Sequence, residues 1–225
     1  MSTILPNTIF TFLKDLKTNN HKDWMQANKK QYLENEKVLK NFYLEIEKAL
    51  NEKDQIETVK IFRINRDIRF SNDKTPYNVH RSVSFSRAGE HRRGGYYLRI
   101  EPGNTLMAGG FFEPNPNDLQ RIRKEFEMDS NPIREIINNP KFHEAFGGFV
   151  QEFAVKTAPK GFSKEDPNLD LIRLKSFFVT HAFKDSEVIA PTFKEELMYH
   201  YELLRPYFDY MSEVLTTDLN GVSLI

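Results

Sequence analysis

The first part of the chain alternates apolar and polar positions with the period of an α-helix. Residues 7–18 and 22–51 both place apolar side chains three and four positions apart, and in 22–51 Lys and Glu fill the opposite face. The segment "TNNH" at 18–21 interrupts the pattern. The sequence therefore predicts a short helix over 7–18, followed by one long helix, or two in tandem, over 22–51.

The middle of the chain has the period of a β-sheet. Alternation with β-branched residues predicts four strands, at 58–64, 82–86, 95–101 and 105–113. Pro102 and Gly103 suit the central positions of a type II turn, so we expect the last two strands to pair as a hairpin. Gly109 and Gly110 inside the final strand indicate a bulge or the close approach of another group.

The last part returns to helical spacing. Asn115 is placed to cap a helix that has Pro116 in its first turn. Pro206 lies inside the final apolar stripe and predicts a kink or a break just before it. Between them we expect short helices over 132–138 and 141–147, a loop over 157–168, and a short helix running into a strand over 171–183.

Helices, then strands, then helices again predict an α+β fold. We expect a mostly antiparallel central sheet, built from residues of about 58–113 plus a strand near 174–181 and covered by the N- and C-terminal helices. The length of 225 residues favours a single domain over 1–225. Its parts would be a helical stretch at 1–55, a sheet with an arginine-rich loop at 56–114, and a helical stretch with one strand at 115–225.

Composition narrows the possible chemistry. There is no cysteine, which excludes disulfides, thiolate metal sites and cysteine nucleophiles. The six histidines form no i, i+4 pair, and neither a phosphate-binding glycine loop nor a serine-hydrolase elbow occurs, so we expect no metal site and assign no cofactor or catalytic residue. No signal peptide or membrane-spanning run is visible, so we expect a cytoplasmic protein with no membrane partner.

Charge is unevenly distributed along a chain that is neutral overall. Residues 60–99 hold ten Lys or Arg against three acids, a net of +7, whereas residues 100–225 hold thirteen against twenty, a net of −7. The basic middle can be neutralised by the acidic C-terminal part, or it can face an anionic partner.

Four of these cations lie within "RINRDIRFSNDKTPY", residues 63–77, where three arginines stand three residues apart. The segment leaves the end of a predicted strand without periodicity, so we expect a loop on a rigid scaffold. Two guanidinium groups about 6 Å apart repel by about 2.8 kcal/mol at an effective dielectric of 20, but by only about 0.7 kcal/mol in water. A partly buried cluster would therefore need anions nearby.

Our leading hypothesis is a domain that binds a small anionic ligand carrying phosphate or carboxylate. Arg63, Arg66 and Arg69 would hold the anion, because the guanidinium fork matches such groups. Lys74 would add a point charge and Tyr77 a hydroxyl donor. Asp67 would orient an arginine, and its arginine neighbours would keep its pKa too low for a general base near neutral pH.

Several alternatives stay open. The cluster could be a structural Arg–Asp network, or it could form part of an interface between copies of the chain. The whole 60–99 face, with aromatics at Phe85, Tyr96 and Tyr97, could bind nucleic acid or an acidic protein, although a sequence pI near 7 does not favour nucleic acid. His80 and His91 lie among positive neighbours, which would lower their pKa and leave them neutral.

Residues 63–77 also carry a resemblance. They match the spaced signature R-x-x-R-D-x-R-F-x-x-(D or N)-K-x-x-Y at every position, and "NNHKDWMQANKKQY" near the N-terminus is similar in the same way. The chain thus resembles a family of conserved hypothetical proteins, domain of unknown function 2461. The resemblance implies similarity along the length of the chain and a shared role for the signature segment, but no reaction.

Overall fold

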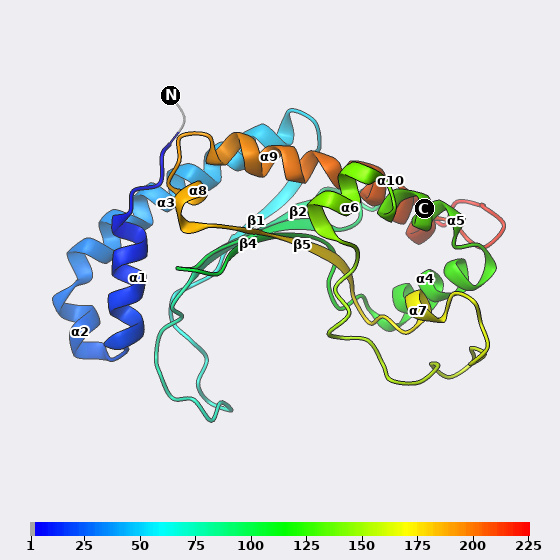
Figure 1. The fold of residues 1–225 in the computed structure, drawn as a ribbon, viewed down its shortest axis with the longest axis horizontal. Helices are drawn as coiled ribbons and strands as arrows, with labels where there is room; N and C mark the ends of the chain where they lie inside the picture. The colour runs from blue at the N-terminus through cyan, green and yellow to red at the C-terminus, as the bar shows by residue number, and fades with distance from the viewer. Residues whose placement is uncertain (1–2) are drawn as a thin grey trace. The chain divides into compact units, whose positions relative to one another are not determined.

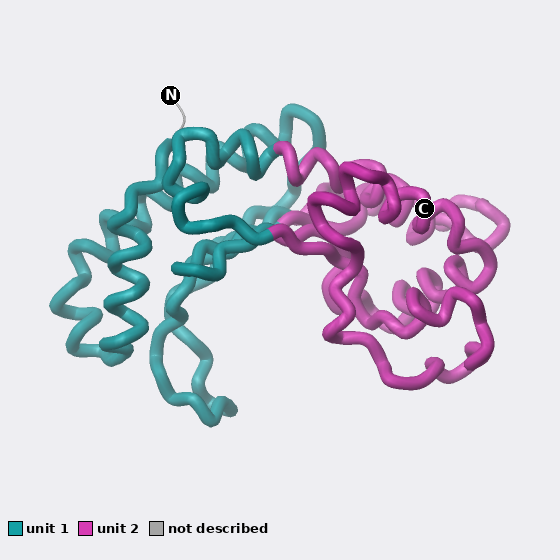
Figure 2. Tube along the Cα trace, viewed as in Figure 1, with its two compact units in different colours: residues 1–85, 97–107, 182–198 teal, residues 86–96, 108–181, 199–225 magenta. Residues whose placement is uncertain are grey.

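The computed structural model describes residues 3–225, and they form two compact units. Among these residues the first unit comprises 3–85, 97–107 and 182–198, and the second comprises 86–96, 108–181 and 199–225 (Figure 2). The boundary falls inside strands, so neither unit is a continuous piece of sequence. The single domain expected from the length stays a prediction.

Five strands form one antiparallel sheet in which the strand order follows the sequence. The predicted α+β fold is confirmed, including the late strand, which starts three residues later than expected and ends two residues later. The strands are β1 (Ile56–Ile61), β2 (Arg81–Arg87), β3 (Gly95–Ile100), β4 (Thr105–Phe111) and β5 (Phe177–Phe183), shown in Figure 1.

The first unit begins with the predicted helical segment. Its long stretch is two helices in tandem, because the chain turns at Asn28, whose backbone N–H and side-chain amide both donate to Trp24 O. Phe42 of the second of these helices stacks on Phe193 with ring centroids 5.6 Å apart, and Phe183 of β5 meets Phe193 edge-on at 5.2 Å. The helices are α1 (Thr8–Thr18), α2 (Lys22–Ala27), α3 (Lys29–Asn51) and α8 (Asp185–Val188), followed by α9 (Phe193–Leu203).

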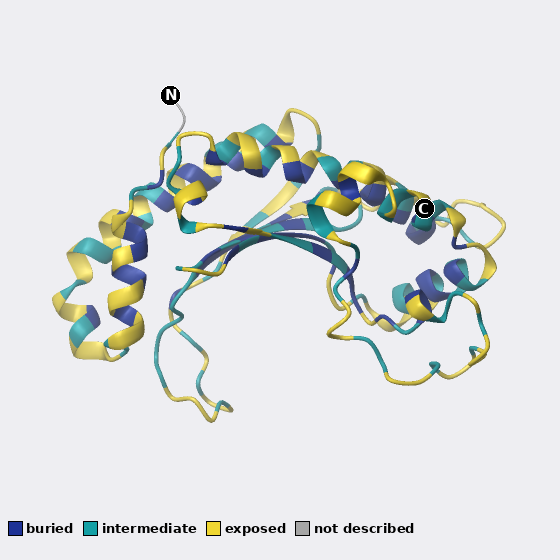
Figure 3. Ribbon diagram, viewed as in Figure 1, coloured by how far each residue is buried: buried dark blue, intermediate teal, exposed yellow. Residues whose placement is uncertain are grey.

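The second unit is built around aromatic side chains. Phe208 packs edge-on against Tyr96 at 5.0 Å and against Phe111 at 6.1 Å, which joins a helix to β3 and β4. The final helical stretch breaks at Leu204, two residues before Pro206, as the sequence predicted. The helices here are α4 (Pro116–Met128), α5 (Asn131–Ile137), α6 (Pro140–Phe146), α7 (Leu169–Ile172) and α10 (Arg205–Thr216). Figure 3 shows that the helices carry buried residues, in dark blue, on one face and exposed residues, in yellow, on another.

The paired glycines of β4 allow two close approaches, as their sequence position indicated. A Cβ on Gly109 would lie 2.1 Å from Leu204 Cδ1. Gly110 has φ +141°, and a Cβ there would lie 2.3 Å from the carbonyl oxygen of Phe177 on the neighbouring strand. Backbone cannot yield as a side chain can, so Gly110 is the more restrictive of the two.

We expect Gly110→Ala to lower the free energy of unfolding by more than about 2 kcal/mol, because it adds both a clash and an unfavourable φ. Gly103→Ala is the matched control: its φ is also positive, at +71°, but nothing lies within 4 Å of the added Cβ, so we expect a cost of about 1 kcal/mol. Urea denaturation measures both, and equal losses would contradict the proposed close approach.

Candidate functional site

The signature segment forms a long irregular loop between β1 and β2, residues 62–80, called here the arginine loop. Figure 1 shows it extending away from the ends of these two strands. Its two legs pair at the base through Arg66 N–H to Pro76 O at 2.9 Å and Asn78 N–H to Ile64 O at 2.7 Å. Ile64 is buried at 3 % exposure and anchors the first leg. The predicted loop on a rigid strand is therefore present.

Arg66 shapes the second leg of the loop from within. Its Nη1 donates to Asp73 Oδ2 at 2.5 Å, to Thr75 O at 3.1 Å and to the Thr75 hydroxyl. Asp73 in turn accepts from the Thr75 N–H at 2.9 Å. The Thr75 backbone and hydroxyl, and then Arg66, lower the pKa of Asp73. Arg66 thus behaves as part of a structural network, one of the alternatives the sequence left open.

Arg69 and Asp67 form an exposed bidentate pair at the loop's far end. Arg69 Nε donates to Asp67 Oδ1 at 3.0 Å and Nη2 donates to Oδ2 at 2.7 Å. The Arg69 side chain and backbone N–H are the main causes of the lowered pKa of Asp67, and Arg63 adds a smaller effect. Asp67 thus holds the Arg69 guanidinium in one orientation, and its lowered pKa makes it a poor general base.

The remaining three predicted residues occupy separate positions. Lys74 Nζ donates to Ile68 O at 3.0 Å across the loop. The side-chain amide of Asn20, which follows α1, donates to Tyr77 O at 2.9 Å and accepts from the Tyr77 N–H at 3.1 Å. Tyr77 is therefore held through its backbone rather than through its hydroxyl. Arg63 is exposed and makes no ion pair with a carboxylate of residues 3–225. The six residues share one loop, but they do not converge on one cavity.

The loop nonetheless keeps an excess of positive charge. It holds four cations and two carboxylates, a net of +2, and both carboxylates already accept bonds from the loop itself. Next to this charge stands Phe70, which is 96 % exposed, with the Arg69 guanidinium carbon 5.9 Å from its ring centroid. Sequence reasoning did not foresee this exposure, because an isolated Phe usually signals the core.

Beyond the loop, the rest of the basic segment is largely neutralised by the protein. Four arginines on or beside β2 and β3 lie within ion-pair distance of carboxylates, and three of those carboxylates come from the acidic C-terminal part, residues 100–225. The broad basic face considered from the sequence is thereby reduced to the arginine loop and a few other cations. The pairs are Arg81–Glu36, Arg87–Asp209, Arg93–Asp118 and Arg99–Glu101.

The Arg81–Glu36 pair is the most buried of these. Arg81 Nε and Nη2 donate to the two oxygens of Glu36 at 2.5 and 2.8 Å, and the side chains are 5 % and 12 % exposed. The pair ties the first residue of β2 to the middle of α3. Burial and Glu36 raise the pKa of Tyr32, and burial raises that of Tyr43, whose hydroxyl has no hydrogen-bond partner among the described residues. Sequence reasoning missed the pair because its partners are 45 residues apart.

His80 closes the arginine loop immediately before Arg81. Its pKa is lowered, as the sequence predicted, but the main cause is burial, with smaller effects from Arg99 and Arg81. Glu101 acts in the opposite direction. His91 is exposed, and its predicted neutrality stays a prediction.

A small cavity of about 230 Å³ adjoins the second leg of the loop in the first unit. Lys14 and Lys17 of α1 line it together with Glu101, and Val79 contributes the loop's side. Lys14 lies 3.5 Å from Asp185. The sequence analysis assigned these lysines no role, and the cavity adds two cations near the loop that no motif marked. Leu13 and Pro102 complete its lining.

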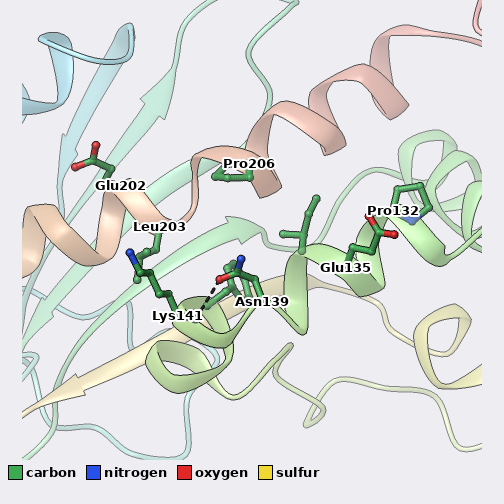
Figure 4. A pocket seen from close by; sticks show the side chains of 9 residues that line it. Pro132, Glu135, Asn139, Lys141, Glu202, Leu203 and Pro206 are labelled. Atoms are coloured by element: carbon green, nitrogen blue, oxygen red, sulfur yellow. Dashed lines mark hydrogen bonds between the residues drawn. The ribbon is translucent and has the colours of Figure 1, made fainter.

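A larger cavity of about 550 Å³ lies in the second unit, against α5, α6 and the α9–α10 break (Figure 4). Phe142 is its buried apolar floor, and Glu135, Lys141 and Glu202 supply charges of both signs. With two acids and one base, this lining offers no excess of cations. It is therefore not part of the candidate anion site. The other lining residues are Pro132, Ile136, Asn139, Leu203 and Pro206.

No group of three or more metal-ligating side chains comes together in residues 3–225. Within the same range, none of the helices is long and apolar enough to cross a membrane.

Comparison with known proteins adds one result. Residues 8–210 match the model of a family described as conserved hypothetical protein, domain of unknown function 2461, and the chain belongs to that family. The match includes the whole arginine loop. No curated protein and no solved structure matches the chain.

We expect Arg81→Ala to lower the free energy of unfolding by about 3–5 kcal/mol, because it leaves Glu36 charged and buried. Replacing both partners, as Arg81→Met with Glu36→Leu, should recover most of that loss. Arg69→Ala is the control: its pair with Asp67 is exposed, and we expect no measurable change. Chemical denaturation followed by circular dichroism measures all three. Similar losses for Arg81→Ala and Arg69→Ala would contradict the assignment.

We expect the imidazole of His80 to titrate below its ordinary pKa of 6.5, because burial disfavours the charged ring. As the pH falls through 6.5, the unfolded state takes up this proton first, so the residue lowers stability on the acid side. Proton NMR of the ring C–H signals measures the pKa, and His80→Gln should remove its share of the acid destabilisation. A pKa at or above 6.5 would show that Glu101 dominates instead.

Proposed function

We propose that the arginine loop binds a small anion that carries phosphate or carboxylate groups. The observation that supports the proposal is the loop's charge excess: four cations share two carboxylates, and the loop's own arginines occupy both. The uncompensated charge sits on a segment whose shape is set by internal hydrogen bonds. Such a segment can present its donors without first being ordered by a ligand.

Within the loop, Arg63 and Lys74 are the residues best placed to contact the anion. Arg63 is exposed, and its guanidinium fork can donate hydrogen bonds to two oxygens of one phosphate or carboxylate. Lys74 donates one ammonium N–H to Ile68 O, and its other N–H groups can donate to a ligand. Arg66 and Arg69 contribute charge mainly while holding their carboxylates. This division of roles replaces the equal contribution of three arginines expected from the sequence.

The exposure of these groups limits the expected affinity. Ion pairs in open water contribute little each, and salt screens them. A simple oxyanion bound by two or three exposed cations should therefore have a dissociation constant on the order of 1 mM. A physiological ligand would need further contacts to bind more tightly.

Two other functions considered from the sequence receive less support. The broad 60–99 face loses four arginines to ion pairs with the protein, which does not favour an extended nucleic-acid or acidic-protein surface. A purely structural network explains Arg66 but leaves Arg63 unexplained. A cytoplasmic location stays a prediction, and no reaction is proposed.

We expect inorganic phosphate, followed by amide chemical shifts, to perturb residues of the arginine loop with an apparent dissociation constant on the order of 1 mM at low salt. Arg63→Ala should weaken this binding about fivefold, the effect of one exposed ion pair. Lys40→Ala, an exposed lysine of α3, is the matched control and should bind like the wild type.

Two results of the phosphate titration would contradict the proposal. Shifts spread over many surface lysines, with no preference for the loop, would indicate nonspecific charge effects. An Arg63→Ala variant with wild-type affinity would remove the residue on which the proposal chiefly rests.

A further inference from the structure

Phe70 is the most exposed large apolar residue of residues 3–225. Its exposure is 96 %, well above the 62 % of Leu224, the next highest. It stands between Arg69 and the second leg of the arginine loop, which has a net charge of +2. An aromatic ring left in water on a charged loop marks a contact surface more than a folding requirement.

The loop is built to hold that ring outward. Three hydrogen bonds within the loop flank it in the sequence. Arg69 donates to Asp67, Lys74 donates to Ile68 O, and Arg66 donates to Asp73. They fix the backbone on both sides of Phe70. A flexible tip could fold its phenyl ring back onto apolar surface, whereas this tip presents it next to cations.

We infer that the anion bound by the arginine loop is the phosphate backbone of a single-stranded nucleic acid, with one base stacked on Phe70. The inference rests on the proposed anion-binding function and names its ligand. Single-stranded nucleic acid offers a flat π-face beside each phosphate, which is the combination that an exposed aromatic ring and neighbouring cations recognise. Arg69, 5.9 Å from the ring centroid, places positive charge beside the stacking platform.

A strand fits better than a single nucleotide. The site is an open loop, so a mononucleotide would gain one stack and one phosphate contact, both in water. A strand brings several phosphates to Arg63, Lys74 and their neighbours at once. A duplex fits less well, because its bases are already stacked on each other and cannot reach Phe70.

A strand also fits better than a membrane. The loop offers one apolar side chain for insertion, and stable peripheral attachment needs more than one such signal. The cations beside Phe70 would reach anionic lipid headgroups, but the small apolar area limits that binding. Anionic vesicles therefore serve as a competing ligand in the test.

The test is fluorescence anisotropy with a labelled oligothymidine of about ten nucleotides, a length that one single-strand site can cover. We expect the full-length protein to bind it more tightly than inorganic phosphate or thymidine monophosphate, with affinity falling as salt rises. Phe70→Ala should weaken binding about tenfold, the loss of one base stack. Phe70→Trp should retain binding, and Phe70→Leu should not. Leu44→Ala, an exposed apolar side chain of α3, is the matched control.

The outcomes separate this inference from the proposed function. If phosphate binds through Arg63 but the oligonucleotide is insensitive to Phe70, the nucleic-acid inference is wrong and the anion site stands. If neither ligand binds the loop, both are wrong. Preference for duplex DNA, or binding to phosphatidylserine vesicles without binding to the oligonucleotide, would also overturn the inference.

Discussion

The buried ion pair between Arg81 and Glu36 is the constraint on which the candidate site depends. Arg81 follows directly on the last residue of the arginine loop, and its two hydrogen bonds to Glu36 hold that point against α3. Because a buried charge cannot be left without its partner, the position of β2 relative to this helix is strongly restricted. The second leg of the loop therefore starts from a fixed point, with Ile64 anchoring the first.

Electrostatics then divides the arginines by burial. Those next to the sheet, such as Arg81 and Arg87, are buried and each has a protein carboxylate within reach. Arg63 lies in water, where an unpaired charge costs little, and it has no carboxylate partner among residues 3–225. Arginine thus has two roles within residues 60–99. Buried arginines hold the scaffold together, and the exposed Arg63 carries charge without a carboxylate partner among residues 3–225. This contrast is the physical basis for assigning ligand contact to the loop alone.

Much of the fold could be predicted because local patterns determine it. Pro206 predicts the break at Leu204, and the Pro102-Gly103 pair predicts the turn in which Gly103 has a positive φ. The pairing of Arg81 with Glu36 could not be predicted, since a charge on a strand carries no information about which distant helix it meets. The exposure of Phe70 could not be predicted either, because its residue type predicts burial. Only the loop's internal hydrogen bonds explain why its side chain stays in solvent. The signature marks the segment in which we propose the site, but the contacts of each residue within it depend on geometry.

The central claim is that the arginine loop carries positive charge that the protein does not neutralise. Relaxation of amide protons by charged nitroxide molecules in solution measures this local potential directly. We expect an anionic nitroxide to relax amides of residues 62–80 more strongly than a cationic one, with the difference shrinking as salt is added. Equal effects of the two probes, or a stronger effect of the cationic one, would contradict the account.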